Sequence, residues 1–248
     1  MIEEYDKLSK YSLREIKKIM EKLDFKPVMM GGWAVHFHIN EELLRVKGRR
    51  YIGSKDIDLG VTTSAEYRKI TETLEKLGYK PLSFRYYKIL DYETGKPATS
   101  SLPLYRLFYI FVDIAVDNKR RVAGRTVLEE PLLSEIVNKE GYTLKEKFKL
   151  PDPEYCMAMK IKAASERAGE KLIKDQIDMI LLYAFTSLNL DFLQELVIRE
   201  NLKNKIRDIV SRINSKILVN ELRILRFEAS EAENLVATFR ISIKTLSE

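Results

Sequence analysis

The stretch Val28-Met-Met-Gly-Gly-Trp-Ala-Val-His-Phe-His38 joins two apolar segments through a pair of glycines. The segment before the pair, from Phe25 to Met30, is predicted to form a short buried strand, and the chain from Trp33 onward a helix. A tight turn from strand to helix needs one glycine at most. Two adjacent glycines, in a chain that has only ten, indicate that another group must come very close to the backbone there.

A second strand is predicted shortly after a basic connector. In Lys55-Asp-Ile-Asp-Leu-Gly-Val61, apolar residues alternate with Asp56, Asp58 and Gly60, which is typical of a strand with one apolar face. Asp56 and Asp58 are two residues apart, so both carboxylates leave the same face with about 7 Å between their Cα atoms. Such a pair can reach one Mg²⁺, which prefers a few carboxylates together with substrate phosphates. Taken alone, the pair is more often a solvated strand face.

A third carboxylate changes that balance. In Phe111-Val-Asp-Ile-Ala-Val-Asp117, the residues Val112, Ile114 and Val116 form an apolar face, while Asp113 and Asp117 point the other way. Three carboxylates on one sheet face repel one another unless cations compensate, and a two-metal phosphoryl-transfer site supplies that compensation. The glycine pair at a helix N-terminus would place phosphates beside the metals, because it offers free N–H groups to an anion. We select Asp113 by its pattern, with Asp117 as the alternative.

The rest of the chain predicts a change of architecture near residue 150. Helices are expected over residues 9–23 and 64–77, and strands over 82–90, 104–108, 110–116 and 121–127. Asp152-Pro153-Glu154 is typical of a helix start, and nearly everything after it has helical periodicity. The sequence therefore predicts an α/β (α+β) domain over residues 1–150, with a mixed sheet and flanking helices, and a helical C-terminal domain over residues 151–248.

Composition limits the classes of function. The chain is 45% hydrophobic and 32% charged, as in ordinary globular proteins, and Cys156 is its only cysteine, which excludes a disulfide framework. The N-terminal sequence lacks a signal-peptide pattern, and no apolar run approaches the ~20 residues that span a bilayer. We therefore expect a cytoplasmic protein without a membrane partner. A net charge of +6 favours an anionic partner such as a nucleotide or a nucleic acid.

Gly31-Gly32-Trp33-Ala34-Val35, followed by Ser54-Lys55-Asp56-Ile57-Asp58-Leu59, resembles the signature of the DNA polymerase β-type nucleotidyltransferase superfamily. Within it, the motifs are most similar to those of toxin-type (AbiEii-like) and small antibiotic nucleotidyltransferases. The resemblance covers roughly residues 27 to 117. It implies that Gly31, Gly32 and Lys55 bind a nucleoside triphosphate such as ATP. It also implies that Asp56, Asp58 and Asp113 are catalytic and bind Mg²⁺ or Mn²⁺.

A second block resembles the helical motifs that follow the catalytic domain in the toxin-type proteins. It runs from Pro153 through Lys160 and Arg167 to Asp178. If this block is one helix, positions 160, 167, 171, 174 and 178 share a face. A solvated helix face is the alternative. With the resemblance, Lys160 is expected to bind the triphosphate, and Arg167 and Asp178 are further candidates for the nucleotide site.

The sequence thus predicts an enzyme that moves a nucleoside monophosphate to an acceptor hydroxyl. Basic runs, Arg45 to Lys55 and Lys119 to Arg121 with Arg125, flank the acidic strands and favour an anionic acceptor. The resemblance to the toxin-type proteins implies that this acceptor is a tRNA or other RNA, with an aminoglycoside-type small molecule or a protein as the alternative. A partner antitoxin and a non-catalytic nucleotide-binding module are further hypotheses. His36, His38 and Trp33 are interpreted mainly as packing residues, with base stacking as the alternative for Trp33.

Overall fold

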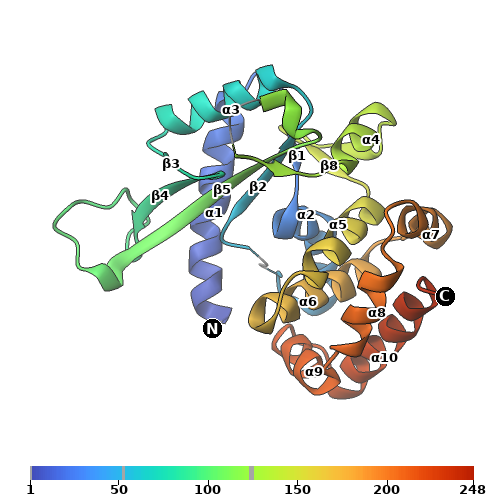
Figure 1. Ribbon diagram of the computed structural model, residues 1–248. Helices are drawn as coiled ribbons and strands as arrows, with labels where there is room; N and C mark the ends of the chain where they lie inside the picture. The colour runs from blue at the N-terminus through green and yellow to red at the C-terminus, as the bar shows by residue number, and fades with distance from the viewer. Residues whose placement is uncertain (1, 52–53, 123–125) are drawn as a thin grey trace. The chain divides into compact units, whose positions relative to one another are not determined.

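The computed structural model describes residues 2–51, 54–122 and 126–248, which form two compact units (Figure 1). The first unit comprises Met1–Trp33 and Ser54–Pro151, and the second Ala34–Gly53 and Asp152–Glu248. The longer segment of the second unit starts at Asp152, next to the expected boundary at residue 150. The second unit also takes in Ala34–Gly53, a segment that was expected in the α/β domain over residues 1–150.

A mixed, eight-stranded sheet forms the centre of the first unit. Its order is β3-β4-β5-β2-β1-β8-β7, with β6 paired to β5; β2 runs parallel to β5, and β1 parallel to β8. The strands are β1 (Val28–Met29), β2 (Ile57–Val61), β3 (Lys80–Leu82), β4 (Arg85–Asp91), β5 (Leu107–Val116), β6 (Leu128–Glu129), β7 (Tyr142–Leu144) and β8 (Lys149–Pro151).

One face of the β4–β5 hairpin is buried in the core beneath α1 (Ile2–Lys22), and α3 (Ser64–Lys76) packs beside α1 (Figure 1). Alternate residues of β5, among them Ile110 and Val112, are fully buried. Lys88 of β4 lies on the same face, where its ammonium bonds Glu15 of α1 at 2.8 Å. On the opposite face, α4 (Leu132–Asn138) places Leu133 against Gly60 of β2, where there is no side chain.

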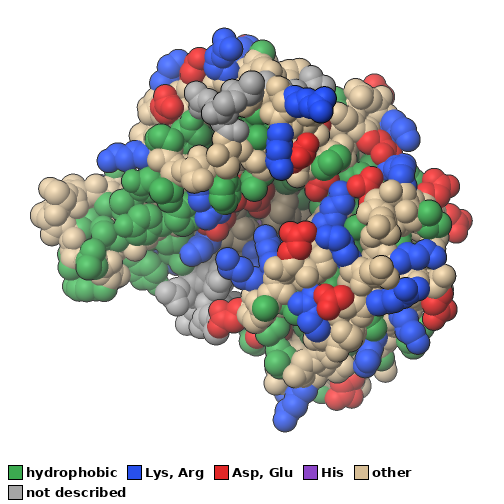
Figure 2. Space-filling view, in the orientation of Figure 1, with side chains coloured by type: hydrophobic (Ala, Val, Ile, Leu, Met, Phe, Trp, Pro, Cys, Tyr) green, Lys and Arg blue, Asp and Glu red, His purple; other side chains and the backbone are tan. Residues whose placement is uncertain are grey.

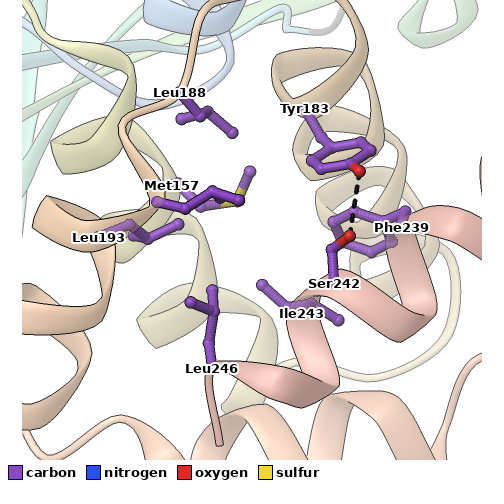
Figure 3. A pocket seen from close by; sticks show the side chains of 9 residues that line it. Met157, Tyr183, Leu188, Leu193, Phe239, Ser242, Ile243 and Leu246 are labelled. Atoms are coloured by element: carbon purple, nitrogen blue, oxygen red, sulfur yellow. Dashed lines mark hydrogen bonds between the residues drawn. The ribbon is translucent and has the colours of Figure 1, made fainter.

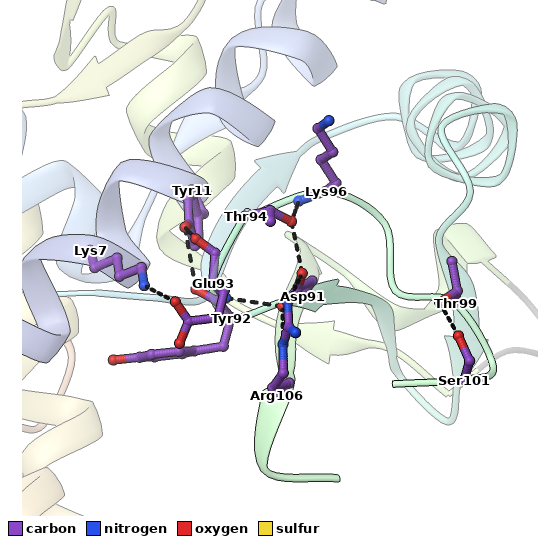
Figure 4. A network of polar contacts seen from close by, with 10 residues as sticks. All are labelled: Lys7, Tyr11, Asp91, Tyr92, Glu93, Thr94, Lys96, Thr99, Ser101 and Arg106. Atoms are coloured by element: carbon purple, nitrogen blue, oxygen red, sulfur yellow. Dashed lines mark hydrogen bonds and ion pairs between the residues drawn. The ribbon is translucent and has the colours of Figure 1, made fainter. Parts of the chain in front are cut away.

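A polar network fixes the connection between β4 and β5 (Figure 4). Asp91, the last residue of β4, accepts hydrogen bonds from Arg106 Nη2 at 2.6 Å and Thr94 Oγ1 at 2.9 Å. Tyr11 of α1 donates its hydroxyl to the carbonyl of Glu93 at 3.0 Å. The 3₁₀ turn η1 (Leu104–Arg106) then leads directly into β5. The β4–β5 hairpin is thus held at its turn as well as along its strands.

The second unit contains most of α2 (Gly31–Lys47) and the C-terminal helices. These are α5 (Pro153–Ser165), α6 (Gly169–Phe185), α7 (Leu190–Arg199), α8 (Lys203–Ser211), α9 (Ser215–Ile224) and α10 (Ala229–Thr245). A cavity of about 10 Å³ lies between Met157, Tyr183, Leu193 and Phe239, with the Tyr183 and Ser242 hydroxyls bonded at 3.0 Å on its wall (Figure 3). That volume is no more than one water molecule needs, so the cavity is a packing gap rather than a ligand site.

The predicted α+β class, a mixed sheet with flanking helices followed by a helical region, is confirmed. Several predicted elements are wrong. The strands expected over 104–108 and 110–116 are one strand, β5, preceded by a 3₁₀ turn. The strand expected over 121–127 is replaced at its start by the 3₁₀ turn η2 (Lys119–Val122), and residues 123–125 lie outside the described residues. Within the described ranges, no helix is both long and apolar enough to cross a bilayer.

The assumption that residues 160–178 form one helix, on which their shared face depends, is also wrong. α5 ends at Ser165 and α6 begins at Gly169. The φ of Gly169 is +59°, close to the +61° of Gly31, the first residue of α2. A positive φ breaks helical geometry, so the two segments form a helical hairpin instead of one stripe. Consequently, residues 160 and 178 come together across two helices rather than along one face.

Candidate active site

The parallel pairing of β2 with β5 brings the predicted carboxylates together. Asp58 and Asp113 are Cα partners in this pairing, and Asp56 lies just before β2 on the same side as Asp58. Asp113 is only 13% exposed at its side chain. Two neighbouring strands thus supply an acidic cluster on the face that α1 does not cover.

Gly31 is the residue against which the Asp58 carboxylate lies. A Cβ atom added to Gly31 would be 1.9 Å from Asp58 Oδ2, and Gly31 also has φ +61°. The backbone N–H of Met30 donates to the carbonyl of Asp58 at 2.9 Å. The close approach that the glycine pair predicts is therefore made, within this chain, by a carboxylate.

The pair does not form a turn before the helix, because Gly31 and Gly32 are the first two residues of α2. The first N–H groups of a helix lack intrahelical partners and favour negative charge. The Asp58 carboxylate lies at this helix end, and Gly32 is buried in the first turn. The helix N-terminus is thus an anion-binding position that is already lined by one side-chain anion.

Arg85 of β4 neutralises the third carboxylate. Its Nε and Nη2 atoms donate to Asp113 Oδ1 and Oδ2 at 2.8 and 2.7 Å, and its guanidinium lies 4.3 Å from the centre of the Phe111 ring. The hydrogen bonds to Asp113 raise the pKa of Arg85, so this residue stays charged. No pattern in the sequence indicated Arg85. Only the antiparallel register of β4 and β5, which pairs Arg85 with Asp113, identifies it.

Asp56 lies in an environment that disfavours its charged form. Burial raises its pKa above the ordinary carboxyl range, while the charges of Lys55 and Arg85 oppose this increase. Its Oδ1 atom is buried without a hydrogen-bond partner. A buried acceptor of this kind is costly unless a cation or donor reaches it, which makes Asp56 a position where a ligand would gain binding energy.

Asp117, the alternative third carboxylate, lies beyond the end of β5. It is buried and accepts a hydrogen bond from Ser134 Oγ of α4. Its environment is therefore the junction between the strand end and α4. The geometry favours Asp113 as the partner of Asp58, because only Asp113 stands opposite Asp58 in the register.

The donor set of the cluster suits a hard divalent cation, since all its ligands would be carboxylate oxygens. As the side chains stand, no three acidic, histidine or cysteine residues in the described ranges converge closely enough to hold a metal ion. Asp113 is bound on both oxygens by Arg85, whereas Asp56 offers a buried oxygen without a partner. Mg²⁺ would therefore be held by Asp56 and Asp58, and by Asp113 once its oxygens turn from Arg85.

The second unit brings Lys160, Arg167 and Asp178 together around Asp175. The buried Lys160 ammonium bonds Asp175 at 2.9 Å and pairs with Asp178, and Arg167 bonds the other oxygen of Asp175 at 2.8 Å. The Tyr51 hydroxyl donates to Asp178 at 2.6 Å. Burial lowers the pKa of Lys160, but the charges of Asp178 and Asp175 outweigh burial and raise it. The nucleotide roles of Lys160, Arg167 and Asp178 stay predictions.

The remaining candidates lie in structural contacts. Trp33 is 1% exposed, which supports packing rather than base stacking, and His36 Nδ1 lies 2.9 Å from the carbonyl of Tyr51. In the basic connector, Lys47 bonds Glu231 and Arg49 donates to the carbonyl of Ile224. Arg125 lies outside the described residues.

Neither a scan of protein-family models nor a search of curated proteins finds a match for this chain.

Proposed function

We propose that this protein is a Mg²⁺-dependent nucleotidyltransferase that moves a nucleoside monophosphate from a triphosphate to an acceptor hydroxyl in the cytoplasm. One observation carries the proposal: Asp58 and Asp113 stand opposite each other on parallel strands, with Asp58 against the glycine that opens α2. This arrangement joins an acidic cluster, which can hold a divalent cation, to a helix N-terminus, which favours phosphate.

In the proposed reaction, the acceptor hydroxyl oxygen forms a bond to the α-phosphorus while the bond from that phosphorus to the pyrophosphate oxygen breaks. Pyrophosphate leaves, and the hydroxyl proton passes to the Asp113 carboxylate. Bound Mg²⁺ would neutralise charge on the transferring phosphoryl group. Asp56 and Asp58 supply carboxylates that would hold the cation, and Gly31 lets the Asp58 carboxylate lie against the first turn of α2, where phosphate oxygens would meet the N–H groups of the helix end.

Arg85 has a positioning role in this scheme. Its two hydrogen bonds hold Asp113 before the reaction and must break when Asp113 accepts the proton, while its charge offsets the repulsion among the carboxylates. For the acceptor, we favour an RNA end such as that of tRNA, because the chain carries a net charge of +6. Small molecules and protein hydroxyls are the competing acceptors, and an antitoxin is the proposed regulatory partner.

A second candidate is a nucleotide-binding module without turnover. The observation that favours it is the arginine on Asp113: a carboxylate bound on both oxygens accepts neither a metal nor a proton while that pair persists. Release of pyrophosphate separates the two candidates, since binding alone produces none.

The test incubates the protein with Mg²⁺ and labelled triphosphates, once with total RNA and once with aminoglycosides. We expect label on RNA, pyrophosphate release, and a loss of transfer of ~10³-fold or more in Asp58→Asn. Asp24→Asn is the matched control, because Asp24 lies in the same unit but is exposed, and its carboxylate pairs with Lys69 away from the acidic cluster. Full activity of Asp58→Asn would exclude this site. Triphosphate binding without pyrophosphate release from any acceptor would favour the non-catalytic module.

A further inference from the structure

Three aromatic side chains form a row on the outward face of the β4–β5 hairpin. The Tyr109 and Phe111 rings lie 6.2 Å apart and nearly parallel, at 17°, and the Tyr87 ring lies 6.1 Å from Tyr109 and 6.5 Å from Phe111. Figure 2 shows hydrophobic side chains gathered over these strands. We call Tyr87, Tyr109 and Phe111 the aromatic platform.

The alternation of the two strands explains why the rings face outward. Along both strands, buried residues on the α1 side alternate with partly exposed residues on the other side. Tyr87 stands opposite Phe111 in the antiparallel register, so the two rings share a face. Tyr109 is 40% exposed. Large aromatic surface left partly open to water in this way is typical of a binding face.

The aromatic platform leads to the acidic cluster. Tyr109, Phe111 and Asp113 are alternate residues of β5, so they lie in a line on one face. The register continues that line on β4, where Tyr87 is followed toward Asp113 by Arg85. A ligand that covers the rings therefore reaches the proposed reacting carboxylate at the end of the row.

The charges around the platform favour an anionic ligand. Lys80 of β3 is exposed and stands opposite Tyr87, and Arg85 lies over the Phe111 ring. The two acidic residues on this face of β4 and β5, Asp91 and Asp113, are each bound by an arginine. This face of the hairpin thus offers flat rings and cations together, and the acidic charge of β4 and β5 is compensated, whereas Asp58 on β2 and Asp56 just before β2 lie at its end.

We propose that the aromatic platform binds the unpaired bases of a single-stranded RNA end and directs its terminal hydroxyl toward Asp113. This inference deepens the proposed function and rests on it for the role of Asp113. Bases stack on aromatic side chains without regard to sequence, and nearby cations contact the phosphates. A duplex keeps its base faces within its own stack, so the platform selects single strands. A protein partner would use the rings as apolar area only. The leucine variants in the test keep apolar area without the rings, so they separate this alternative from base stacking.

The test measures fluorescence anisotropy of a labelled 12-nucleotide RNA of mixed sequence, and of a duplex of equal length, with the full chain in the absence of triphosphate and Mg²⁺. We expect the single strand to bind more tightly than the duplex. Tyr109→Leu, which keeps apolar area but removes the ring, should weaken single-strand binding about 5-fold or more, and Tyr87→Leu with Tyr109→Leu further. Tyr109→Phe should bind like the parent chain. Ile241→Ala, at a site 68% exposed on α10, is the control for a surface apolar change.

Unchanged binding by the double leucine variant, checked for folding by circular dichroism, would overturn the platform. Equal affinity for the duplex and the single strand would also overturn it. A third contradicting result is self-association of the protein that is lost on dilution, is retained in Tyr109→Leu and is abolished in Tyr109→Lys, because the rings would then serve as an apolar contact between copies of the chain. Failure of the proposed function is distinguishable, because this assay involves no turnover. If RNA binding depends on the rings but no transfer occurs, the nucleotidyltransferase proposal is rejected and RNA binding by the aromatic platform is supported. If the double leucine variant transfers efficiently to RNA, the nucleotidyltransferase proposal is supported and RNA binding by the aromatic platform is rejected.

Discussion

At the scale of single residues, two constraints meet at Gly31. The residue has a left-handed backbone, and the space for a side chain is filled by the Asp58 carboxylate. The first constraint alone costs a non-glycine residue about 1–2 kcal/mol. The second ties the backbone of α2 to the proposed metal ligand, so a change at this glycine acts on both stability and the site.

Gly31→Ala should therefore lower the free energy of unfolding by more than Gly78→Ala does. Gly78 lies in the same unit with φ +85° and nothing within 4 Å of an added Cβ, so its substitution carries only the backbone cost. Urea unfolding of both variants measures the difference, which we expect to be at least about 1 kcal/mol, because the Asp58 side chain must move. Equal losses would mean that the Asp58 carboxylate yields freely and that Gly31 serves backbone geometry alone.

At the scale of secondary-structure elements, a buried ionic network joins α5 to α6. Lys160 lies between Asp175 and Asp178, Tyr51 donates a hydrogen bond to Asp178, and Arg167 donates one to Asp175. Removing one partner of such a pair leaves an uncompensated buried charge, which costs far more than an exposed pair contributes. The network explains the helical hairpin without any ligand, and it competes with the nucleotide role predicted for Lys160.

Lys160→Met should lower the free energy of unfolding by about 3–5 kcal/mol if the network is structural. Lys162→Met is the matched control on the same helix. Its ammonium bonds Glu200 at 2.9 Å with both side chains 20% exposed, against 8% and 0% for Lys160 and its partners, so we expect a smaller loss than in Lys160→Met. Urea unfolding and calorimetry with a triphosphate are measured together. A stable Lys160→Met variant that has lost triphosphate affinity would instead support the nucleotide role.

At the scale of the whole molecule, the second unit is built from two separate stretches of chain. Ala34–Gly53 belongs to it together with Asp152–Glu248, and α2 passes from one unit into the other. Ile39 and Leu43 of α2 are fully buried in the complete chain. A cut at the position that the sequence suggests would therefore expose apolar surface on the part of α2 left behind.

A fragment of residues 1–151 should consequently aggregate or lose amide-exchange protection in α2 after residue 34. Co-expression with residues 152–248 should restore a folded complex, because the buried surface of α2 is then covered again. Gel filtration and hydrogen exchange measure both results. A monomeric fragment with α2 fully protected would show that the second unit does not depend on Ala34–Gly53.

Much of the fold and the candidate site could be predicted from local patterns. A single sequence displays side-chain periodicity and backbone freedom. Three features depend on these: the alternation around Asp56, Asp58 and Asp113, the glycine pair, and the helical periodicity that starts after Leu150. These features predicted the fold class and the strands that bear the carboxylates. They also placed Asp58 and Asp113 on one face, and the parallel register of β2 and β5 agrees.

Only the tertiary structure decided which residues meet across the chain. Arg85 lies opposite Asp113, and Tyr87 opposite Phe111, because β4 and β5 pair in one particular register. The two strands are separated by a connection of fifteen residues, and no local pattern encodes the register that follows it. The same holds for Lys160 and Asp178, which meet because the chain breaks at Gly169 instead of continuing one helix. Local preference selects elements, but long-range packing selects their partners, and it is the partners that define the acidic cluster and the aromatic platform.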